Sequence, residues 1–203
     1  MRIFAVLAIA GSTFVGGHIL TLPAAADSSM TPDAHASTAP ADAAPWAEFV
    51  VPGADFSIAL PGRPRARAAV GTSADSFTQA YDAVYDGMAF SVSYEVWPGE
   101  TIQKKLVPDE LLTLSRYRIQ QTTSNLRKET RFPVGDDGAA VDFTVDSPAK
   151  MQSGPYSLRV RFITRTDQSA NVHAYVLVAT FKSSEEQDPD IERFLTSFRV
   201  VTR

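Results

Sequence analysis

The sequence predicts an α+β domain in which helices flank an antiparallel sheet of about six or seven strands. Two runs with strand periodicity, Phe77–Tyr85 and Met88–Trp97, are joined by Asp86-Gly87, a strong short-range hairpin signal. Between Pro108 and Leu126, apolar residues instead recur at helical spacing. Further strand-like runs and a second helical pattern complete the chain, and this order of elements predicts the fold class.

Two short extended segments open the domain, Glu48–Val51 and Asp55–Leu60, and the turn pair Pro52-Gly53 separates them. Large apolar residues occupy every second position of the second segment, which is strand periodicity. The segment Pro61–Pro64 ends this strand, because proline cannot donate a hydrogen bond to a sheet. In the hairpin that follows, the alternation along Met88–Trp97 predicts that one face turns inward.

The first predicted helix starts at Pro108-Asp109-Glu110, where acidic residues suit the positive end of the helix dipole. Its buried stripe contains Leu111, Leu112, Ser115, Ile119, Thr122 or Thr123, and Leu126. Because arginines and glutamines occupy the opposite side, we expect this helix to pack on the sheet through the stripe.

Three strands are expected after this helix: Ala139–Asp146, Ser157–Thr166 and Asn171–Phe181. The first two predict a hairpin with a longer loop, and their polar side chains are expected to share one face as a ladder worth about 0.2–1 kcal/mol per ion pair. The ladder contains Asp142, Thr144, Arg159 and Arg161. The third strand is apolar on both faces, which is typical of a central strand covered above and below.

The chain closes on a second predicted helix, with Asp188 as its N-cap and Pro189 at its first position. Its apolar stripe contains Ile191, Phe194, Leu195 and Phe198. A last short strand, Phe198–Val201, is expected to finish the sheet.

Before the predicted domain, residues 46–203, the sequence predicts an export signal and a tether. Residues 1–26 combine Arg2, an apolar run and the small-residue site Ala24-x-Ala26, which is typical of a cleaved signal peptide, with a retained anchor as the alternative. Residues 27–45, built from Ala, Ser, Thr, Asp and Pro, predict a flexible tether. We therefore expect a periplasmic or secreted protein without a stable transmembrane span once the signal is cleaved.

The composition excludes several kinds of protein. The chain has no cysteine, which rules out disulfides and a lipoprotein anchor. Its formal net charge is −4, and removal of Arg2 with the signal makes it more negative. Nucleic acid is therefore not an expected partner, because neutralising phosphates needs a basic surface.

Three motifs carry a family resemblance: Leu60-Pro61-Gly62-x-Pro64 at a strand end, Val92-Ser93-Tyr94 in the hairpin, and Arg193–Phe198 in the last helix. Together with the order of elements, these motifs are the reason why residues 46–203 resemble the Mog1/PsbP-like family, in particular its small exported bacterial members of unassigned role. The resemblance implies an antiparallel sheet flanked by helices, and action by binding other proteins or assisting assembly rather than by catalysis. It implies no catalytic residues.

A row of basic residues is the candidate binding feature. Arg63, Arg65 and Arg67 recur at every second position after the proline-glycine stop, so an extended backbone projects their guanidinium groups on one side. Such a row suits an anionic partner, for example a lipid phosphate, an envelope glycan or an acidic protein. The alternative is a solvated connection between strands.

His173 is the only histidine of the predicted domain, and at a sheet edge it would be the base of a small periplasmic hydrolase. No Gly-x-Ser-x-Gly motif is present, so we expect a packed histidine instead. The acidic clusters Asp136-Asp137 and Glu185–Asp188 are interpreted as a turn and a helix entry rather than as metal or glycosidase sites. The sequence thus assigns no catalytic, metal-binding or cofactor-binding residue and no cofactor.

The expected function is that of an exported, non-enzymatic binding or assembly module of the cell envelope. Its expected partner is an envelope protein or an anionic envelope component. Two alternatives stay open: the hydrolase using His173, and a carrier of an apolar ligand in a pocket between helix and sheet.

Overall fold

The computed structural model describes residues 46–67, 77–98, 108–122, 125–135, 138–147 and 155–201. The predicted signal peptide at 1–26 and the tether at 27–45 lie outside these ranges, as do Asp136-Asp137 and most of the loop predicted between Asp146 and Ser157.

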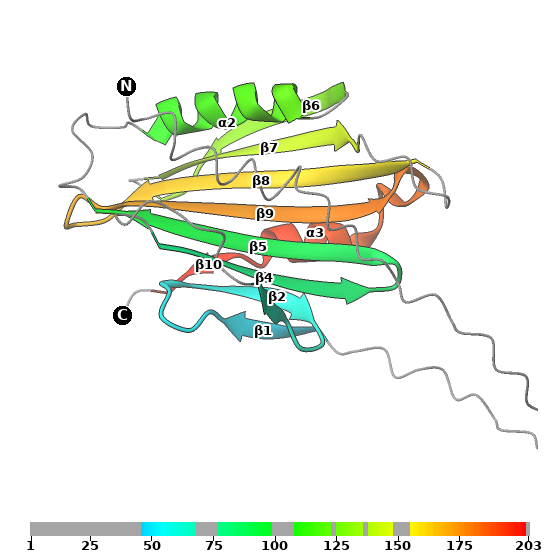
Figure 1. Cartoon of the computed structure of the whole chain (residues 1–203), viewed down its shortest axis with the longest axis horizontal. Coiled ribbons are helices and arrows are strands. Elements are labelled where there is room, and N and C mark those ends of the chain that lie inside the picture. Colours follow the sequence, from blue (N-terminus) through cyan, green and yellow to red (C-terminus); the bar gives the residue numbers. More distant parts are fainter. Residues whose placement is uncertain are drawn as a thin grey trace, which may run out of the picture.

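The domain is built on a seven-stranded antiparallel sheet, here named the main sheet (Figure 1). In spatial order its strands are β3 (Arg65–Arg67), β4 (Phe77–Tyr85), β5 (Met88–Trp97), β9 (Val172–Lys182), β8 (Tyr156–Thr166), β7 (Gly138–Asp146) and β6 (Asn125–Pro133). The predicted fold class is therefore confirmed. The prediction that the strand with two apolar faces is central is also confirmed, because this strand is β9 and has three strands on either side.

The hairpin β4–β5 follows directly from its turn residues. Asp86 and Gly87 both have positive φ, 46° and 77°, as a two-residue type I′ turn requires. The strands pair from Tyr85 opposite Met88 to Phe77 opposite Val96, so the predicted bounds of both strands are confirmed.

A second, three-stranded sheet covers part of one face of the main sheet (Figure 1). This small sheet contains β1 (Trp46–Val50), β2 (Phe56–Pro61) and β10 (Arg199–Val200), with β2 in the middle. The prediction that the last strand finishes the main sheet is wrong, because β10 pairs with β2. The preceding helix, α3 (Pro189–Thr196), packs against β2 and the central strand β9, so the chain leaving it meets the free edge of β2.

The helix α2 (Pro108–Thr122) packs on β7 and β8, on the opposite face from α3 (Figure 1). The prediction that its stripe continues to Leu126 is wrong, because Leu126 lies in β6 and packs against the core beneath α2 from there. The sequence pattern of β6 did not predict a strand, since an edge strand faces water on much of its surface and carries charges instead of regular alternation. Three of these charges form ion pairs: Glu129 with Arg116 and Arg131, and Arg127 with Asp146.

Two apolar cores hold the layers together. The core between the two sheets includes the fully buried Phe56, Phe90, Tyr175, Leu177 and Phe194. The core beneath α2 includes Leu112, Ile119, Val141, Phe143 and Val160. Burying side chains of this size stabilises a fold by about 1.5–3 kcal/mol each. Within the described ranges, no helix is both long and apolar enough to cross a membrane.

Candidate functional site

The three arginines of the predicted row lie at the edge of the main sheet. Arg65 and Arg67 belong to β3, where they pair with Asp82 and Ala80 of β4 and so share one face of the sheet. Arg67 donates from Nε to Asp82 Oδ2 at 2.9 Å and from Nη2 to Ser91 Oγ at 3.0 Å. Its guanidinium is thus held by the sheet itself.

The other two arginines of the row point to solvent. Arg63 and Arg65 are exposed, and neither forms an ion pair with any residue that the structure describes. The row therefore divides into two free cations, Arg63 and Arg65, and one structural cation, Arg67. The sequence alone does not distinguish them, because the partner Asp82 reaches Arg67 only through the β3–β4 pairing.

His173 is the second residue of β9, and its imidazole lies between two carboxylates. Its Nε2 lies 3.1 Å from Asp167 Oδ2, and its Nδ1 lies 3.4 Å from Asp55 Oδ2. Only 12% of its side chain is exposed. The hypothesis that His173 stands at a sheet edge is wrong, because β9 is the central strand of the main sheet. Within this strand, His173 lies near the N-terminal end.

Asp55 connects the small sheet to the β8–β9 hairpin. Its carboxylate accepts hydrogen bonds from Tyr175 Oη at 2.7 Å and from Arg165 Nη1 at 3.1 Å. Its backbone carbonyl accepts the N–H of Val201 at 2.7 Å, next to β10. Burial by itself would raise the pKa of Asp55, but the contacts with His173 and Tyr175 and the charge of Arg165 outweigh it and hold that pKa at about 2.

Asp167 organises the turn between β8 and β9. Its Oδ1 accepts the backbone N–H groups of Ser169 and Asn171 at 2.9 and 2.8 Å, and its Oδ2 accepts the side-chain amide of Asn171 at 2.9 Å. Burial would raise the pKa of Asp167, yet the hydrogen bonds from Asn171 and His173 lower it overall. The turn therefore presents an ionised carboxylate to the imidazole.

One residue of this turn is strained. Ala170 has φ 62°, a left-handed conformation that disfavours a side chain with Cβ. We expect Ala170→Gly to stabilise the protein by about 0.5–1 kcal/mol, measured by chemical denaturation. The matched control is Ser169→Gly, which adds flexibility without relieving strain and should destabilise. Equal effects of the two substitutions would contradict this account.

The charges around His173 favour the protonated form of its imidazole. The contact with Asp55 raises the pKa of His173, burial opposes the rise, and Asp167 adds to it. A base must be neutral to accept a proton, whereas two carboxylates favour the protonated imidazolium. The hydroxyl of Tyr175 lies beside His173 and Asp55 and donates a hydrogen bond to Asp55. Burial raises the pKa of this Tyr175 hydroxyl. The contacts of His173 and Tyr175 with Asp55 therefore join the two layers of the protein.

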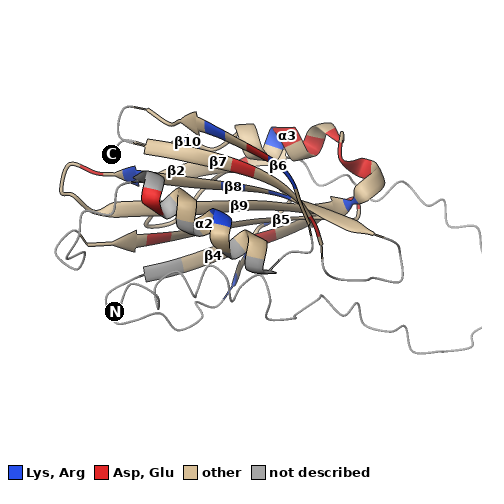
Figure 2. Cartoon of the chain, turned by 90° about the horizontal axis from the view of Figure 1, so that it is seen from above, with Lys and Arg blue, Asp and Glu red and all other residues tan. Residues whose placement is uncertain are grey.

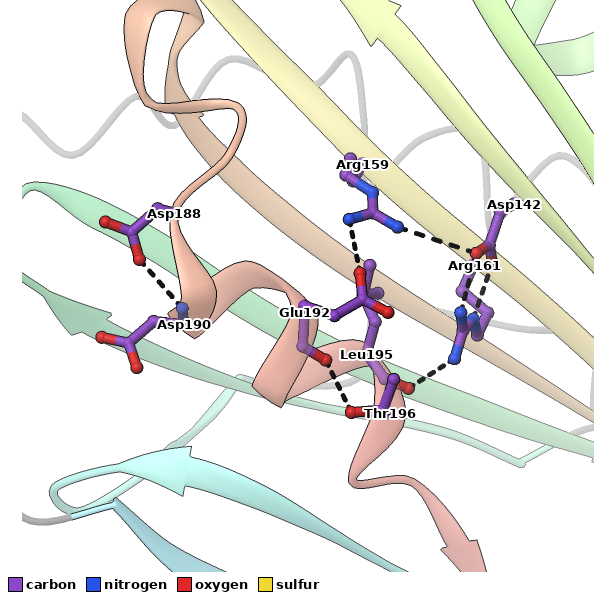
Figure 3. A network of polar contacts seen from close by, with 8 residues as sticks. All are labelled: Asp142, Arg159, Arg161, Asp188, Asp190, Glu192, Leu195 and Thr196. Atoms are coloured by element: carbon purple, nitrogen blue, oxygen red, sulfur yellow. Dashed lines mark hydrogen bonds and ion pairs between the residues drawn. The ribbon is translucent and has the colours of Figure 1, made fainter.

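The predicted charge ladder is confirmed, and it extends to α3 (Figure 3). Asp142 pairs in register with Arg161 and accepts from its Nε at 2.6 Å and its Nη2 at 2.7 Å. Arg161 also donates from Nη1 to the carbonyl of Leu195, in the last turn of α3, at 2.6 Å. Arg159 reaches Glu192 of α3 at 2.8 Å. The ladder therefore fixes the helix to the main sheet.

The acidic segment Glu185–Asp188 lies at the entry of α3, as predicted (Figure 2). Asp188 caps the helix by accepting the N–H of Asp190 at 2.9 Å, and Glu186 pairs with Arg127 at 2.7 Å. Among the described residues, no group of three or more His, Asp or Glu side chains is arranged to hold a metal ion.

The sequence did not indicate that Asp55, Arg165, His173 and Tyr175 come together. Asp55 is separated from Arg165 by 110 positions and from Tyr175 by 120 positions. No motif spacing encodes such a contact, because it depends on how the two sheets pack. A signal available in principle is the short polar turn Asp167–Asn171, which ends two positions before His173.

No family model and no curated protein matches this chain. Among solved structures, the protein of unknown function PA94 from Pseudomonas aeruginosa is 12% identical with a TM-score of 0.42, over 78% of this chain and 97% of that chain. The Ran-binding protein Mog1p of Saccharomyces cerevisiae is 12% identical with a TM-score of 0.43, over 77% of this chain and 96% of that chain. At this similarity neither protein's role transfers, and membership of the Mog1/PsbP-like family stays a prediction from the sequence.

Proposed function

We propose that this chain is an exported, non-enzymatic binding or assembly module of the cell envelope, periplasmic or secreted, which holds an anionic partner through Arg63 and Arg65. The observation that carries the proposal is the pair of exposed guanidinium groups at the open edge of the main sheet. Guanidinium groups bind carboxylates and phosphates with two parallel hydrogen bonds, which suits an acidic protein or a phosphate-bearing envelope component.

The position of His173 supports a non-enzymatic role. Its two ring nitrogens face the carboxylates of Asp55 and Asp167, so the charges around it favour an imidazolium rather than a base. A hydrolase using His173 would need a neutral imidazole beside a hydroxyl that it can deprotonate.

The packing between α2 and the main sheet argues against the alternative function, a carrier of an apolar ligand. A carrier of the kind expected from the sequence would hold its ligand between α2 and the main sheet. At that place Leu112, Ile119, Val141, Phe143 and Phe162 are buried and belong to one apolar cluster. Side chains that pack against one another there favour a binding module over a carrier.

The test compares two variants of the arginine row. The double variant Arg63→Ser/Arg65→Ser should weaken capture of anionic partners while changing the free energy of unfolding by no more than about 0.5 kcal/mol, because exposed side chains contribute little to folding. Arg67→Ser is the matched control. It should lower stability by up to about 1 kcal/mol, since it removes the partly exposed pair with Asp82, and should leave capture largely intact.

Capture is measured with the full exported protein on vesicles containing an anionic phospholipid, on zwitterionic vesicles, and on an extract of its own envelope, each over a series of salt concentrations. Binding through Arg63 and Arg65 should fall as salt rises, because exposed charges are screened over about 8 Å at physiological ionic strength. If the double variant captures the same partners with the same salt dependence as the wild type, the two arginines are a solvated connection and the proposal fails.

A further inference from the structure

The polar cluster around His173 joins the two layers of the protein at one end of β9. Asp55 lies directly before β2 and belongs to the layer of the small sheet. Arg165, Asp167, His173 and Tyr175 all belong to the β8–β9 hairpin of the main sheet. Every contact that Asp55 makes with this hairpin therefore holds one layer on the other.

We propose that His173 forms a pH-sensitive contact between the two layers. Its imidazolium attracts the carboxylate of Asp55 and so holds the small sheet against the main sheet, and loss of the imidazolium proton weakens this contact. This inference concerns the stability of the layer contact and does not depend on the partner proposed for Arg63 and Arg65.

The charges that face His173 come from every element packed around it. Asp55 faces it from the small-sheet layer, Arg165 stands opposite it on β8, and Asp167 faces it from the turn. On the β5 side its register partner is Val96, which has no charge. With His173 protonated, two cations meet two carboxylates. With His173 neutral, Arg165 is the one positive charge left in the cluster to balance the two carboxylates. Of these two carboxylates it contacts that of Asp55, at 3.1 Å.

His173 is the member of the cluster that changes charge near neutral pH. The pKa of Asp55, at about 2, and the lowered pKa of Asp167 keep both carboxylates ionised. Burial raises the pKa of Tyr175 above its ordinary value of 10, and arginine does not lose its proton in proteins. Between about pH 5 and 9 the cluster therefore titrates through its imidazole alone.

The direction of the effect follows from the raised pKa of His173. The contacts with Asp55 and Asp167 favour the protonated form in the closed layer arrangement. The stabilisation is complete below the ordinary pKa of 6.5 and is lost as the pH rises through the raised value. Loosening would uncover the aromatic contacts of Phe56 and Phe198 with Tyr175, whose ring centroids lie 5.1 and 5.0 Å apart.

The experiment measures two quantities on the full exported protein between pH 5 and 9. The ring resonances of His173, followed by NMR and assigned with the His173→Gln variant, give its pKa. Amide hydrogen exchange at β2, corrected for the intrinsic pH dependence of exchange, gives the protection of the small sheet. Protection should fall between the ordinary pKa of His173 and the raised pKa measured in the closed protein, by about tenfold for each unit that separates the two values.

His173→Gln should remove this pH dependence, because glutamine carries no charge at any pH. Glu186→Gln is the matched control, since Glu186 follows the other end of β9 and pairs with Arg127. It should keep the full pH dependence of the wild type. The proposal is overturned if β2 protection stays constant while His173 titrates, or if His173→Gln keeps the wild-type dependence.

A second variant covers the case in which His173→Gln does not fold. Asp167→Asn removes the carboxylate charge at Nε2 but keeps an oxygen to accept the N–H groups of Ser169 and Asn171. It should lower the His173 pKa and shift the upper end of the fall in β2 protection to lower pH by the same amount. A shift in one of the two quantities without the other would show that the imidazole does not control the layer contact.

Discussion

Replacing Arg161 with alanine is expected to destabilise the protein by about 3 kcal/mol, because it removes one partner of a partly buried ion pair. Only 13% of the Arg161 side chain and 19% of the Asp142 side chain are exposed. After the substitution, the nearest cation to Asp142 is Arg159, at 3.9 Å, and the carbonyl of Leu195 loses its donor. The guanidinium also lies 4.9 Å from the ring centroid of Phe132, and this contact would be lost too.

Chemical denaturation of the wild type, Arg161→Ala and Arg159→Ala measures this effect. Arg159→Ala is the matched control on the same strand and face. Its partner Glu192 is 56% exposed, so we expect a loss of no more than about 1 kcal/mol. The double variant Arg161→Met/Asp142→Leu should recover much of the stability, since an apolar pair leaves no charge buried without a partner. If Arg161→Ala costs no more than Arg159→Ala, Arg161 does not anchor α3.

Replacing Asp55 with alanine is expected to lower the free energy of unfolding by about 2–3 kcal/mol at neutral pH. The substitution leaves the buried hydroxyl of Tyr175 without its acceptor, and Arg165 and His173 without the carboxylate that they share as an ion-pair partner. The lowered pKa gives the pH dependence. A carboxyl at about 2 in the fold, against its ordinary 3.8, stabilises the protein above pH 3.8 and loses that contribution as the pH falls through 2.

Unfolding curves for the wild type and Asp55→Ala, recorded at pH values from neutral to strongly acidic, test this prediction. The stabilities of the two proteins should converge as the pH falls. Asp55→Asn is the matched control: its amide oxygen still accepts from Tyr175, but it carries no charge, so its stability should lie between the other two. A constant difference between wild type and Asp55→Ala down to the lowest pH would contradict the role of the ionised carboxylate.

Local signals in the sequence determined the hairpins, the caps and the centre of the main sheet. Asp86-Gly87 supplies two positive φ angles between alternating strands, and that fixes the bounds of β4 and β5. Asp188 and Pro189 start α3 as predicted, because capping depends on residues adjacent in the chain. The apolar composition of both faces of β9 predicted its central place. In each case the information lies within a few neighbouring residues.

Only the tertiary structure decided which sheet each short strand joins and which charges meet. The edge strand β6 and the pairing of β10 with β2 have weak local patterns, since short or exposed strands are specified by the neighbours that they find. Arg63, Arg65 and Arg67 look equivalent in the sequence. The β3–β4 register places Asp82 opposite Arg65, yet the carboxylate of Asp82 binds the neighbouring Arg67.

The cluster of Asp55 with His173 is the clearest case of a feature that the sequence could not predict. Asp55 lies directly before β2 of the small sheet, and His173 lies in β9 of the main sheet. Their contact exists because the aromatic core of Phe56, Tyr175 and Phe198 sets the small sheet on the main sheet at that position. A sequence pattern records which face of a strand is apolar, but the position at which two apolar faces meet follows from the packing of all their side chains together.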